Sequence, residues 1–313
     1  MPIKNVGAIL ILLLSILFPA PAEAGQLPCG CNESNRHLLL LNPPLQGSDV
    51  RELQQRLAQL GFYFGPLNGL YNQVTARAVK NFQASKGLNP SGEVGPATWS
   101  ALGENSSAIS QRQSTGGPPA GSKLRLLIEL DKRTLTILVD GKPWRTYPVA
   151  IGKFETPSPV GEWKVVHKSR DWGGSFGTRW MGLNVPWGVY GIHGTNKPWT
   201  IGSAASAGCF RMHNQDVEEI FPWIDIGTPV EVKGPYTKPT APLKRGQTMP
   251  EVVTVQALLR QAGFYLFGPT DGFYGVMTEI AIKQFQYLHS LEATGELDEA
   301  TLETLLMFSR PEA

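Results

Sequence analysis

Residues 50–83 read VRELQQRLAQLGFYFGPLNGLYNQVTARAVKNFQ, and residues 252–286 read VVTVQALLRQAGFYLFGPTDGFYGVMTEIAIKQFQ. With one residue inserted in the second stretch, the two sequences align from end to end. The matched pairs include Gly61/Gly263, Asn68/Asp271, Tyr71/Tyr274, Thr75/Thr278 and Phe82/Phe285. A match of this length has a negligible chance of arising by accident, so the chain contains an internal duplication.

Each copy has the pattern of a small helical bundle. In the first copy Leu53, Leu57 and Leu60 recur at helical spacing, and the second copy keeps this pattern. Gly61 and Gly263 stand where this first helix must end, because glycine adopts the left-handed conformation at low cost. An Asn-Gly or Asp-Gly pair then favours a tight turn in each copy.

Two further helices complete each predicted bundle. Thr75 is expected to cap the second helix of the first copy, and Thr278 that of the second copy. The third helices are expected near residues 96–102 and 299–306. We place the two small three-helix bundles at residues 47–103 and 247–308, each close to the lower size limit for a single stable core.

The repeated pattern resembles the peptidoglycan-binding domain of secreted wall enzymes. Its core, LQxxLxxxGFY followed by (N/D)GxY and later by FQ, runs through both copies, with Val255 at the first leucine of the second copy. The resemblance implies that each copy binds peptidoglycan, with Tyr71, Tyr274 and the polar groups of the turns as candidate contacts. Two binding units on one chain would raise the apparent affinity for a polymer.

Residues 1–24 have the pattern of a secretory signal peptide. Lys4 precedes an apolar run over residues 6–18, and the Ala-Glu-Ala at residues 22–24 fits a small-x-small cleavage site. The apolar run is short for a membrane span. We therefore expect a secreted protein of the bacterial cell envelope with no stable membrane span after cleavage; an uncleaved N-terminal anchor is the alternative.

Two linkers separate the copies from a central segment. Residues 104–123 are rich in Ser, Gly and Pro and are expected to be flexible, and residues 234–246 are expected to form an extended Pro-rich spacer. Residues 124–233 carry strand-like runs that end in turns, with one short helix expected near Asn214 or Asp216. We predict a multidomain α+β protein whose central domain is mainly β, closed as a sandwich or a partial barrel.

The sequence contains three cysteines, Cys29, Cys31 and Cys209. Cys29 and Cys31 lie in a CGC triplet outside any domain pattern, and they pair with each other, with another chain or not at all. Cys209 has no obvious intrachain partner, and a leftover cysteine in a secreted protein suggests a reactive thiol. No second close pair of cysteines exists, so a zinc site of the CxxC type is excluded.

Cys209 stands among residue types that suit a nucleophile. His193 ends a predicted strand, and a loop of small residues then returns the chain to Cys209. A thiolate nucleophile needs an imidazole to take its proton, and the Gly194 carbonyl or another backbone carbonyl is expected to orient that imidazole. Gly208 would let the amides around Cys209 point into one oxyanion site, and Arg211, on the same strand face, would grip a substrate carboxylate.

This stretch resembles the active-site motif of the L,D-transpeptidase (YkuD-like) catalytic domain. That motif is a histidine, then Ser/Thr-x-Gly-Cys, then Arg or Asn, and here His193 is followed by SAGCFR at residues 206–211. The TPSPVG run at residues 156–161 also fits. One position departs from many relatives, which carry histidine where Ala207 stands. The resemblance covers residues 124–233, the whole central segment.

The resemblance implies a reaction and roles for its residues. Cys209 would be the nucleophile and His193 the acid/base. The residues that would hold the substrate or the oxyanion are Arg211, Gly208, Gly194 and Ser206. The thiol would release D-alanine from a peptidoglycan stem, and the thioester would pass to a second stem as a 3→3 cross-link. With water as the acceptor the enzyme would be an L,D-carboxypeptidase, and an inactive wall-binding scaffold is the other alternative.

Composition and histidine placement exclude other classes of function. A net charge of +2, with dispersed aromatic residues, gives no basis for nucleic-acid binding. His213 and His193 would offer a zinc ion too few ligands, without a supporting carboxylate, so we do not expect a zinc hydrolase. The resemblance to the L,D-transpeptidase domain implies neither a metal nor an organic cofactor. The expected partner is peptidoglycan, both its stem peptides and its glycan, and the oligomeric state stays open.

Overall fold

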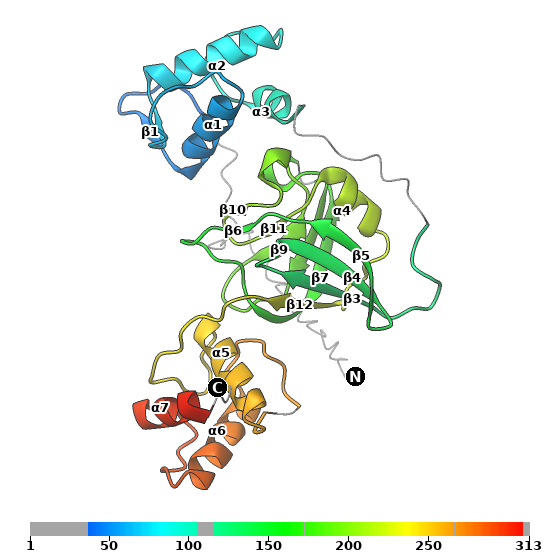
Figure 1. Ribbon diagram of the computed structural model, residues 1–313, viewed down its shortest axis with the longest axis vertical. Helices are drawn as coiled ribbons and strands as arrows, with labels where there is room; N and C mark the ends of the chain where they lie inside the picture. The colour runs from blue at the N-terminus through cyan, green and yellow to red at the C-terminus, as the bar shows by residue number, and fades with distance from the viewer. Residues whose placement is uncertain (1–36, 105–115, 172, 266, 309–313) are drawn as a thin grey trace, which may run out of the picture.

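The structure is a computed structural model that describes residues 37–104, 116–171, 173–265 and 267–308. Figure 1 shows an N-terminal repeat, a central domain and a C-terminal repeat in a row, and each has a hydrophobic core of its own. The predicted signal peptide, Cys29, Cys31 and most of the first linker lie outside the described residues. Within the described ranges, no helix combines the length and the apolar character that crossing a membrane requires.

The N-terminal repeat is a helical bundle, as predicted. Its helices are α1 (Ser48–Gln59), α2 (Gln73–Ser85) and α3 (Pro96–Gly103). Two short strands, β1 (Leu45–Gln46) and β2 (Leu70–Tyr71), pair antiparallel beside them. Leu53 and Leu57 of α1 are fully buried, so the helical spacing read from the sequence faces the core.

The C-terminal repeat has the same arrangement of helices. They are α5 (Pro250–Gln261), α6 (Val276–Leu288) and α7 (Glu299–Phe308). Val255 and Leu259 of α5 are fully buried at the positions that match Leu53 and Leu57. Gly263 follows α5 with a φ of +85°, the left-handed conformation expected where the first helix ends.

A buried glutamine fixes the tight turn in each copy. Gln54 Oε1 accepts a hydrogen bond from the Gly69 amide at 2.9 Å, and Gln54 Nε2 donates to Thr75 Oγ1 at 3.1 Å. Gln256 accepts the equivalent bond from the Gly272 amide at 2.9 Å. A buried amide side chain needs such partners, so these bonds tie the turn to the helices around it.

The helix caps differ from the prediction. Asn72, not Thr75, caps α2, because Asn72 Oδ1 accepts hydrogen bonds from the Val74 and Thr75 amides at 3.0 and 3.1 Å. In the other copy Gly275 precedes α6 and provides no side-chain cap, so the prediction for Thr278 is wrong as well. Both threonines lie within the first turn of their helices, where they are fully buried.

Tyr71 and Tyr274 belong to the cores of the repeats. Both side chains are fully buried. Their hydroxyls donate to the carbonyl oxygens of Gly92 at 2.6 Å and of Gly295 at 2.8 Å. The prediction that these tyrosines contact peptidoglycan is therefore wrong, because a polymer cannot reach them.

The central domain is built on a mixed sheet with the strand order β11-β9-β8-β7-β12-β3-β4-β5. The strands are β3 (Leu124–Glu129), β4 (Thr134–Val139), β5 (Lys142–Pro148), β7 (Gly161–Arg170), β8 (Arg179–Leu183), β9 (Tyr190–His193), β11 (Phe210–Arg211) and β12 (Pro229–Lys233). A separate parallel pair joins β6 (Ile151–Gly152) to β10 (Ala204–Ser206).

The predicted fold class, a mainly-β central domain between helical bundles in an α+β chain, is confirmed. The sheet curves around its core, which corresponds to the partial barrel among the two closures expected (Figure 1). The predicted short helix is α4 (Asn214–Ile220), and its Val217 and Ile220 pack into the core of this domain.

Strand β8 was not predicted from the sequence. Trp180, Met181 and Leu183 on this strand are all buried, so the strand lacks the alternation of apolar and polar residues that marks a half-buried strand. It lies between β7 and β9 in the sheet, directly beside the strand that carries His193.

Candidate active site

Two neighbouring strands bring His193 and Cys209 close together. Strand β9 ends at His193, and β11 begins at Phe210, directly after Cys209. The two strands pair in parallel, with Ile192 opposite Phe210 and His193 opposite Arg211. This pairing closes the loop between His193 and Cys209 and sets Cys209 directly before Phe210, the residue that pairs with Ile192 of β9.

A backbone carbonyl orients the buried His193 ring. Its Nδ1 lies 2.5 Å from the Gly194 carbonyl oxygen, so Nδ1 donates and the lone pair lies on Nε2. The Gly194 carbonyl thus makes the expected contact with the imidazole, and its part in catalysis stays a prediction. A Cβ on Gly194 would lie 2.1 Å from Asn214 Oδ1, which itself accepts a hydrogen bond from the Thr195 amide at 2.9 Å. Glycine is therefore required at the end of β9.

Trp180 lies against both predicted catalytic residues. Its ring stacks on the His193 imidazole, with the centroids 5.5 Å apart and 26° between the planes. Trp180 also packs with Cys209 in one buried cluster. Phe176, at the end of the 3-10 turn η2 (Gly174–Phe176), meets the His193 ring edge-on at 5.1 Å. Sequence analysis missed both rings, because they lie outside the motif that contains Cys209.

Ser206 and Ser158 shape the turn before Cys209. Ser206 Oγ accepts from the Gly208 amide at 3.0 Å and donates to the Cys209 carbonyl at 2.6 Å. Ser158, within the TPSPVG run, donates to the Gly208 carbonyl at 2.9 Å. Gly208 has a φ of +115°, and a Cβ there would lie 2.7 Å from the Tyr190 ring. The prediction of a shared oxyanion site is wrong for the Gly208 amide, because Ser206 binds that amide within the turn.

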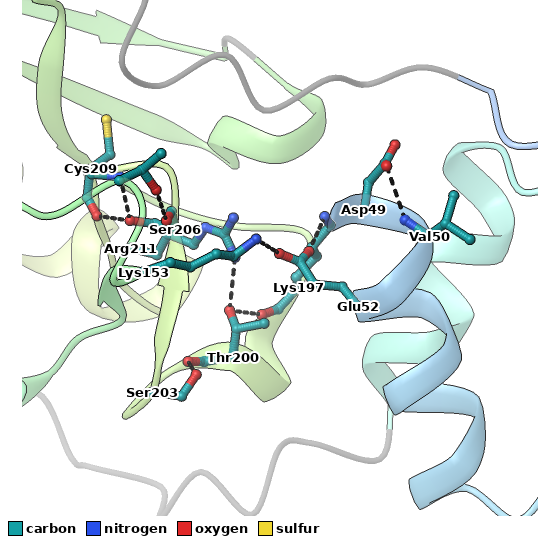
Figure 2. A network of polar contacts seen from close by, with 12 residues as sticks. Asp49, Val50, Glu52, Lys153, Lys197, Thr200, Ser203, Ser206, Cys209 and Arg211 are labelled. Carbon is teal, nitrogen blue, oxygen red and sulfur yellow. Dashed lines mark hydrogen bonds and ion pairs between the residues drawn. The ribbon is translucent and has the colours of Figure 1, made fainter. Parts of the chain in front are cut away.

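Arg211 extends away from the Cys209 sulfur. Figure 2 shows the guanidinium reaching toward the N-terminal repeat while the sulfur points to the other side. The side chain is 1% exposed, and its Nη1 donates to Thr200 Oγ1 at 3.2 Å. Cys209 lies in the turn before β11, so the alternation of a strand does not place it on the face of Arg211. A substrate-binding role for Arg211 stays a prediction.

A carboxylate from the N-terminal repeat lies beside this arginine. Glu52 of α1 forms ion pairs with Lys197 at 2.6 Å and with Lys153 at 3.0 Å (Figure 2). Burial alone raises the pKa of Glu52, but the charges of Lys197, Arg211 and Lys153 together outweigh burial and lower this pKa from 4.5 to about 2. Glu52 is therefore ionised at neutral pH. Nothing in the sequence near Cys209 pointed to it.

The Cys209 sulfur is held in a disulfide, and the side chain is fully buried. Cys209 is the one cysteine among the described residues, and Cys29 and Cys31 precede them. The prediction of an unpaired Cys209 is therefore wrong for this state of the protein. Because the thiolate is the nucleophilic form of cysteine, any reaction at Cys209 requires reduction of the disulfide first.

Two cavities approach the turn before Cys209 from different sides. A cavity of about 1050 Å³ lies between α1 and the central domain, and one of about 320 Å³ lies between the central domain and the C-terminal repeat. Glu155, Thr156 and Ala207 line both cavities. Ala207 stands two residues before Cys209, so both cavities border the turn that precedes the predicted nucleophile, although Cys209 itself lines neither.

His213 lies at the N-cap position of α4. Burial lowers its pKa, against the opposing effect of the Asp216 charge. Over the ranges that the structure covers, the His, Cys, Asp and Glu side chains form no group of three that could hold a metal ion.

The chain matches two known families of domains. Residues 123–232 match the L,D-transpeptidase catalytic domain, YkuD, and residues 46–102 and 248–305 match the peptidoglycan-binding domain. The L,D-transpeptidase YqjB of Bacillus subtilis is 37% identical over 118 residues, which cover 32% of this chain and 67% of that protein. The chain belongs to the L,D-transpeptidase family.

Two further relatives match part of this chain. YkuD of Bacillus subtilis is 41% identical over 107 residues, 34% of this chain and 64% of that protein, so the chain spans just under two thirds of its length. A solved L,D-transpeptidase from Xylanimonas cellulosilytica is 28% identical, with a TM-score of 0.31, over 60% of this chain and 94% of that one. Both resemblances read from the sequence, to the catalytic domain and to the flanking repeats, are confirmed by the family matches.

Proposed function

We propose that this chain is a secreted L,D-transpeptidase that forms 3→3 cross-links in peptidoglycan through a thioester on Cys209. The observation that carries the proposal is that His193 ends β9 and Cys209 directly precedes β11, the strand paired with β9, with Trp180 against both residues. Acyl transfer by a thiol needs a cysteine, a base beside it and a group that orients the base. Here Cys209, His193 and the Gly194 carbonyl would fill these three roles.

The acylation step follows from this arrangement. In the reduced protein, His193 Nε2 takes the proton of the Cys209 thiol. The thiolate attacks the carbonyl carbon that joins the third stem residue, a diamino acid, to D-alanine. The peptide bond breaks, the imidazolium returns the proton to the nitrogen of D-alanine, and a thioester on Cys209 remains.

The second half of the reaction releases the enzyme. The side-chain amine of another stem attacks the thioester carbon, and its proton passes to His193. The carbon–sulfur bond breaks, an amide forms between the two stems, and Cys209 regains its proton. The burial of Cys209 and His193 among aromatic rings supports transfer over hydrolysis, because a shielded thioester meets little water.

The two repeats support a location of the enzyme on the cell wall. Both match the peptidoglycan-binding domain, and we propose that they hold the chain on the wall after export by the signal peptide at residues 1–24. Two binding units would keep the catalytic domain at a high effective concentration near its polymeric substrate.

The test is the intact mass of the reduced chain after mixing with purified disaccharide-tetrapeptide. The expected result is a mass increase equal to the substrate minus D-alanine, which is absent in Cys209→Ala and forms slowly in His193→Ala. If the reduced and folded chain gives neither an adduct nor free D-alanine, the proposal fails. Adding a second stem as acceptor separates the activities, since cross-linked dimer indicates transfer and free tripeptide indicates hydrolysis.

A further inference from the structure

We propose that the N-terminal repeat and the central domain together form one groove that binds the glycan of peptidoglycan beside the turn that precedes Cys209. The groove is the cavity of about 1050 Å³ between α1 and the central domain. The identity of the polymer rests on the proposed function, whereas the groove itself rests on the contacts that hold the two domains together.

An ion pair fixes the N-terminal repeat on the central domain. Glu52 bonds Lys197, and the two side chains are 9% and 7% exposed. Lys153 adds a second cation at 3.0 Å from the other oxygen of Glu52. A buried pair with such geometry holds its partners in place, because separating them leaves uncompensated charge in the interior.

Stacked rings provide a second, independent contact. Trp99 of α3 stacks on Trp199 of the 3-10 turn η3 (Pro198–Thr200), with centroids 6.3 Å apart and 17° between the planes. The Arg56 guanidinium lies 5.2 Å from the centre of the Trp199 ring. These two contacts of different kinds hold the N-terminal repeat against the central domain on the two sides of the groove.

The face of α5 that corresponds to the groove-lining face of α1 is apolar and packs against the central domain. In the aligned copies, α1 carries Arg51, Glu52, Gln55 and Arg56 where α5 carries Val253, Thr254, Ala257 and Leu258. Val253 is buried in the core of the central domain. The turn at Gly272 lies against Trp187, since a Cβ on this glycine would come within 2.2 Å of the ring. The apolar face of the C-terminal repeat is therefore covered by the central domain.

The equivalent face of the N-terminal repeat is polar and borders open space. Arg51, Gln55 and Asn68 line the groove from this side. From the central domain, Phe154 and Trp199 line the opposite wall, and Phe154 is 97% exposed. Amide and guanidinium groups can hydrogen-bond sugar hydroxyls, and an exposed aromatic ring such as that of Phe154 can cover the apolar face of a sugar ring. The groove therefore has the chemistry of a carbohydrate site.

Part of the groove wall belongs to the turn that precedes Cys209. Ala207 of this turn lines the groove together with Thr156. Thr156 Oγ1 donates to the Ser206 carbonyl at 3.2 Å, so the wall of the groove and the turn are directly bonded. The volume of about 1050 Å³ is at the upper end for ligand sites in proteins, which leaves room for a disaccharide with its stem.

The test measures binding without turnover. The full chain carries Cys209→Ala, and the probe is labelled, uncross-linked glycan strands that bear tetrapeptide stems. Phe154→Ala is expected to raise the Kd about tenfold, the size expected for an aromatic anchor in a binding site, and Gln55→Ala is expected to raise it less. Glu52→Lys, which reverses the charge that docks the repeat, is expected to weaken binding at least as much as Phe154→Ala.

Ile226→Ala is the matched control. Ile226 is an apolar side chain of the same domain, 65% exposed and outside both cavities, so its loss is expected to leave the Kd unchanged. The proposal is overturned if Phe154→Ala and Gln55→Ala bind the strands as tightly as their parent, or if the folded parent does not bind them.

The outcome is separable from the test of the proposed function. Acyl-enzyme formation is measured with the small disaccharide-tetrapeptide in the reduced chain that retains Cys209. An adduct together with strand binding that ignores Phe154 would overturn the groove and leave the transpeptidase standing. Strand binding that depends on Phe154 without any adduct would overturn the transpeptidase and leave the groove.

Discussion

The Glu52 carboxylate of α1 lies 2.6 Å from the Lys197 Nζ, although 145 residues separate the two along the chain. Lys197 belongs to the loop that joins His193 to Cys209. The ion pair therefore ties the N-terminal repeat to the loop that closes the candidate active site. A change in the docking of the N-terminal repeat is therefore expected to change the conformation of the loop between His193 and Cys209.

Acidification is expected to release the N-terminal repeat. Burial raises the pKa of Glu52, but three cations outweigh it and set this pKa to about 2 against an ordinary 4.5. Because docking lowers the pKa of Glu52, the contribution of this carboxylate to docking is fully present above about pH 4.5 and is lost as the pH falls through about 2. The shift corresponds to roughly 3 kcal/mol of docking free energy at neutral pH. Hydrogen exchange of the η3 amides between about pH 6 and pH 2 measures the release.

Glu52→Gln is the control for this titration. The amide carries no charge to lose, so docking is expected to be weaker at neutral pH and to change little between about pH 4.5 and pH 2. The same pH dependence of exchange in both proteins would show that another group controls the docking.

Trp180→Ala is expected to slow acyl-enzyme formation by about 10- to 100-fold, because the ring that fixes the His193 plane and packs on Cys209 is lost. Trp180→Phe keeps part of the stack and is expected to retain more of the rate. The measurement is the rate of adduct formation against pH for each reduced protein. A lower melting temperature with an unchanged rate and pH profile would assign Trp180 a structural role alone.

Gly194→Ala is expected to abolish adduct formation and to cost about 2–3 kcal/mol of stability. The added Cβ would lie 2.1 Å from Asn214 Oδ1, so Asn214 would have to move and release the Thr195 amide. Gly202→Ala is the control in the same loop, since its φ is +84° but nothing lies within 4 Å of the added Cβ. It should lose only about 1–2 kcal/mol to backbone strain and keep its activity. If thermal melts show the same loss of stability for both variants, the contact between the added Cβ and Asn214 is not what makes Gly194 necessary.

Reduction is expected to be required before the chain reacts, because the Cys209 sulfur is held in a disulfide. The unreduced chain should give no adduct with disaccharide-tetrapeptide, and reductant should restore it. The Cys29→Ser/Cys31→Ser double variant is expected to react without reductant, since the sequence has no other cysteine that could pair with Cys209 within the chain. Intact mass measures both results. An equal rate for the unreduced and the reduced parent would contradict this expectation.

Much of this protein could be predicted from local pattern. The spacing of Leu53 and Leu57 specified a helix because one face of α1 must meet a core, and Gly61 marked its end because its φ of +79° is easy for glycine alone. The pairing of His193 with Cys209 was predictable because a single loop joins the strand that ends at one to the strand that follows the other.

The sequence by itself determined the duplication, the mainly-β centre and the residues of the cysteine–histidine motif, because these features are encoded in neighbours along the chain. Only the tertiary structure decided that Trp180 covers His193, that Ser206 binds the Gly208 amide and that Glu52 docks beside Arg211. Each of these depends on which strands pair, how a turn closes or which surfaces meet. Such contacts join residues far apart in sequence, and no local pattern of side chains encodes them.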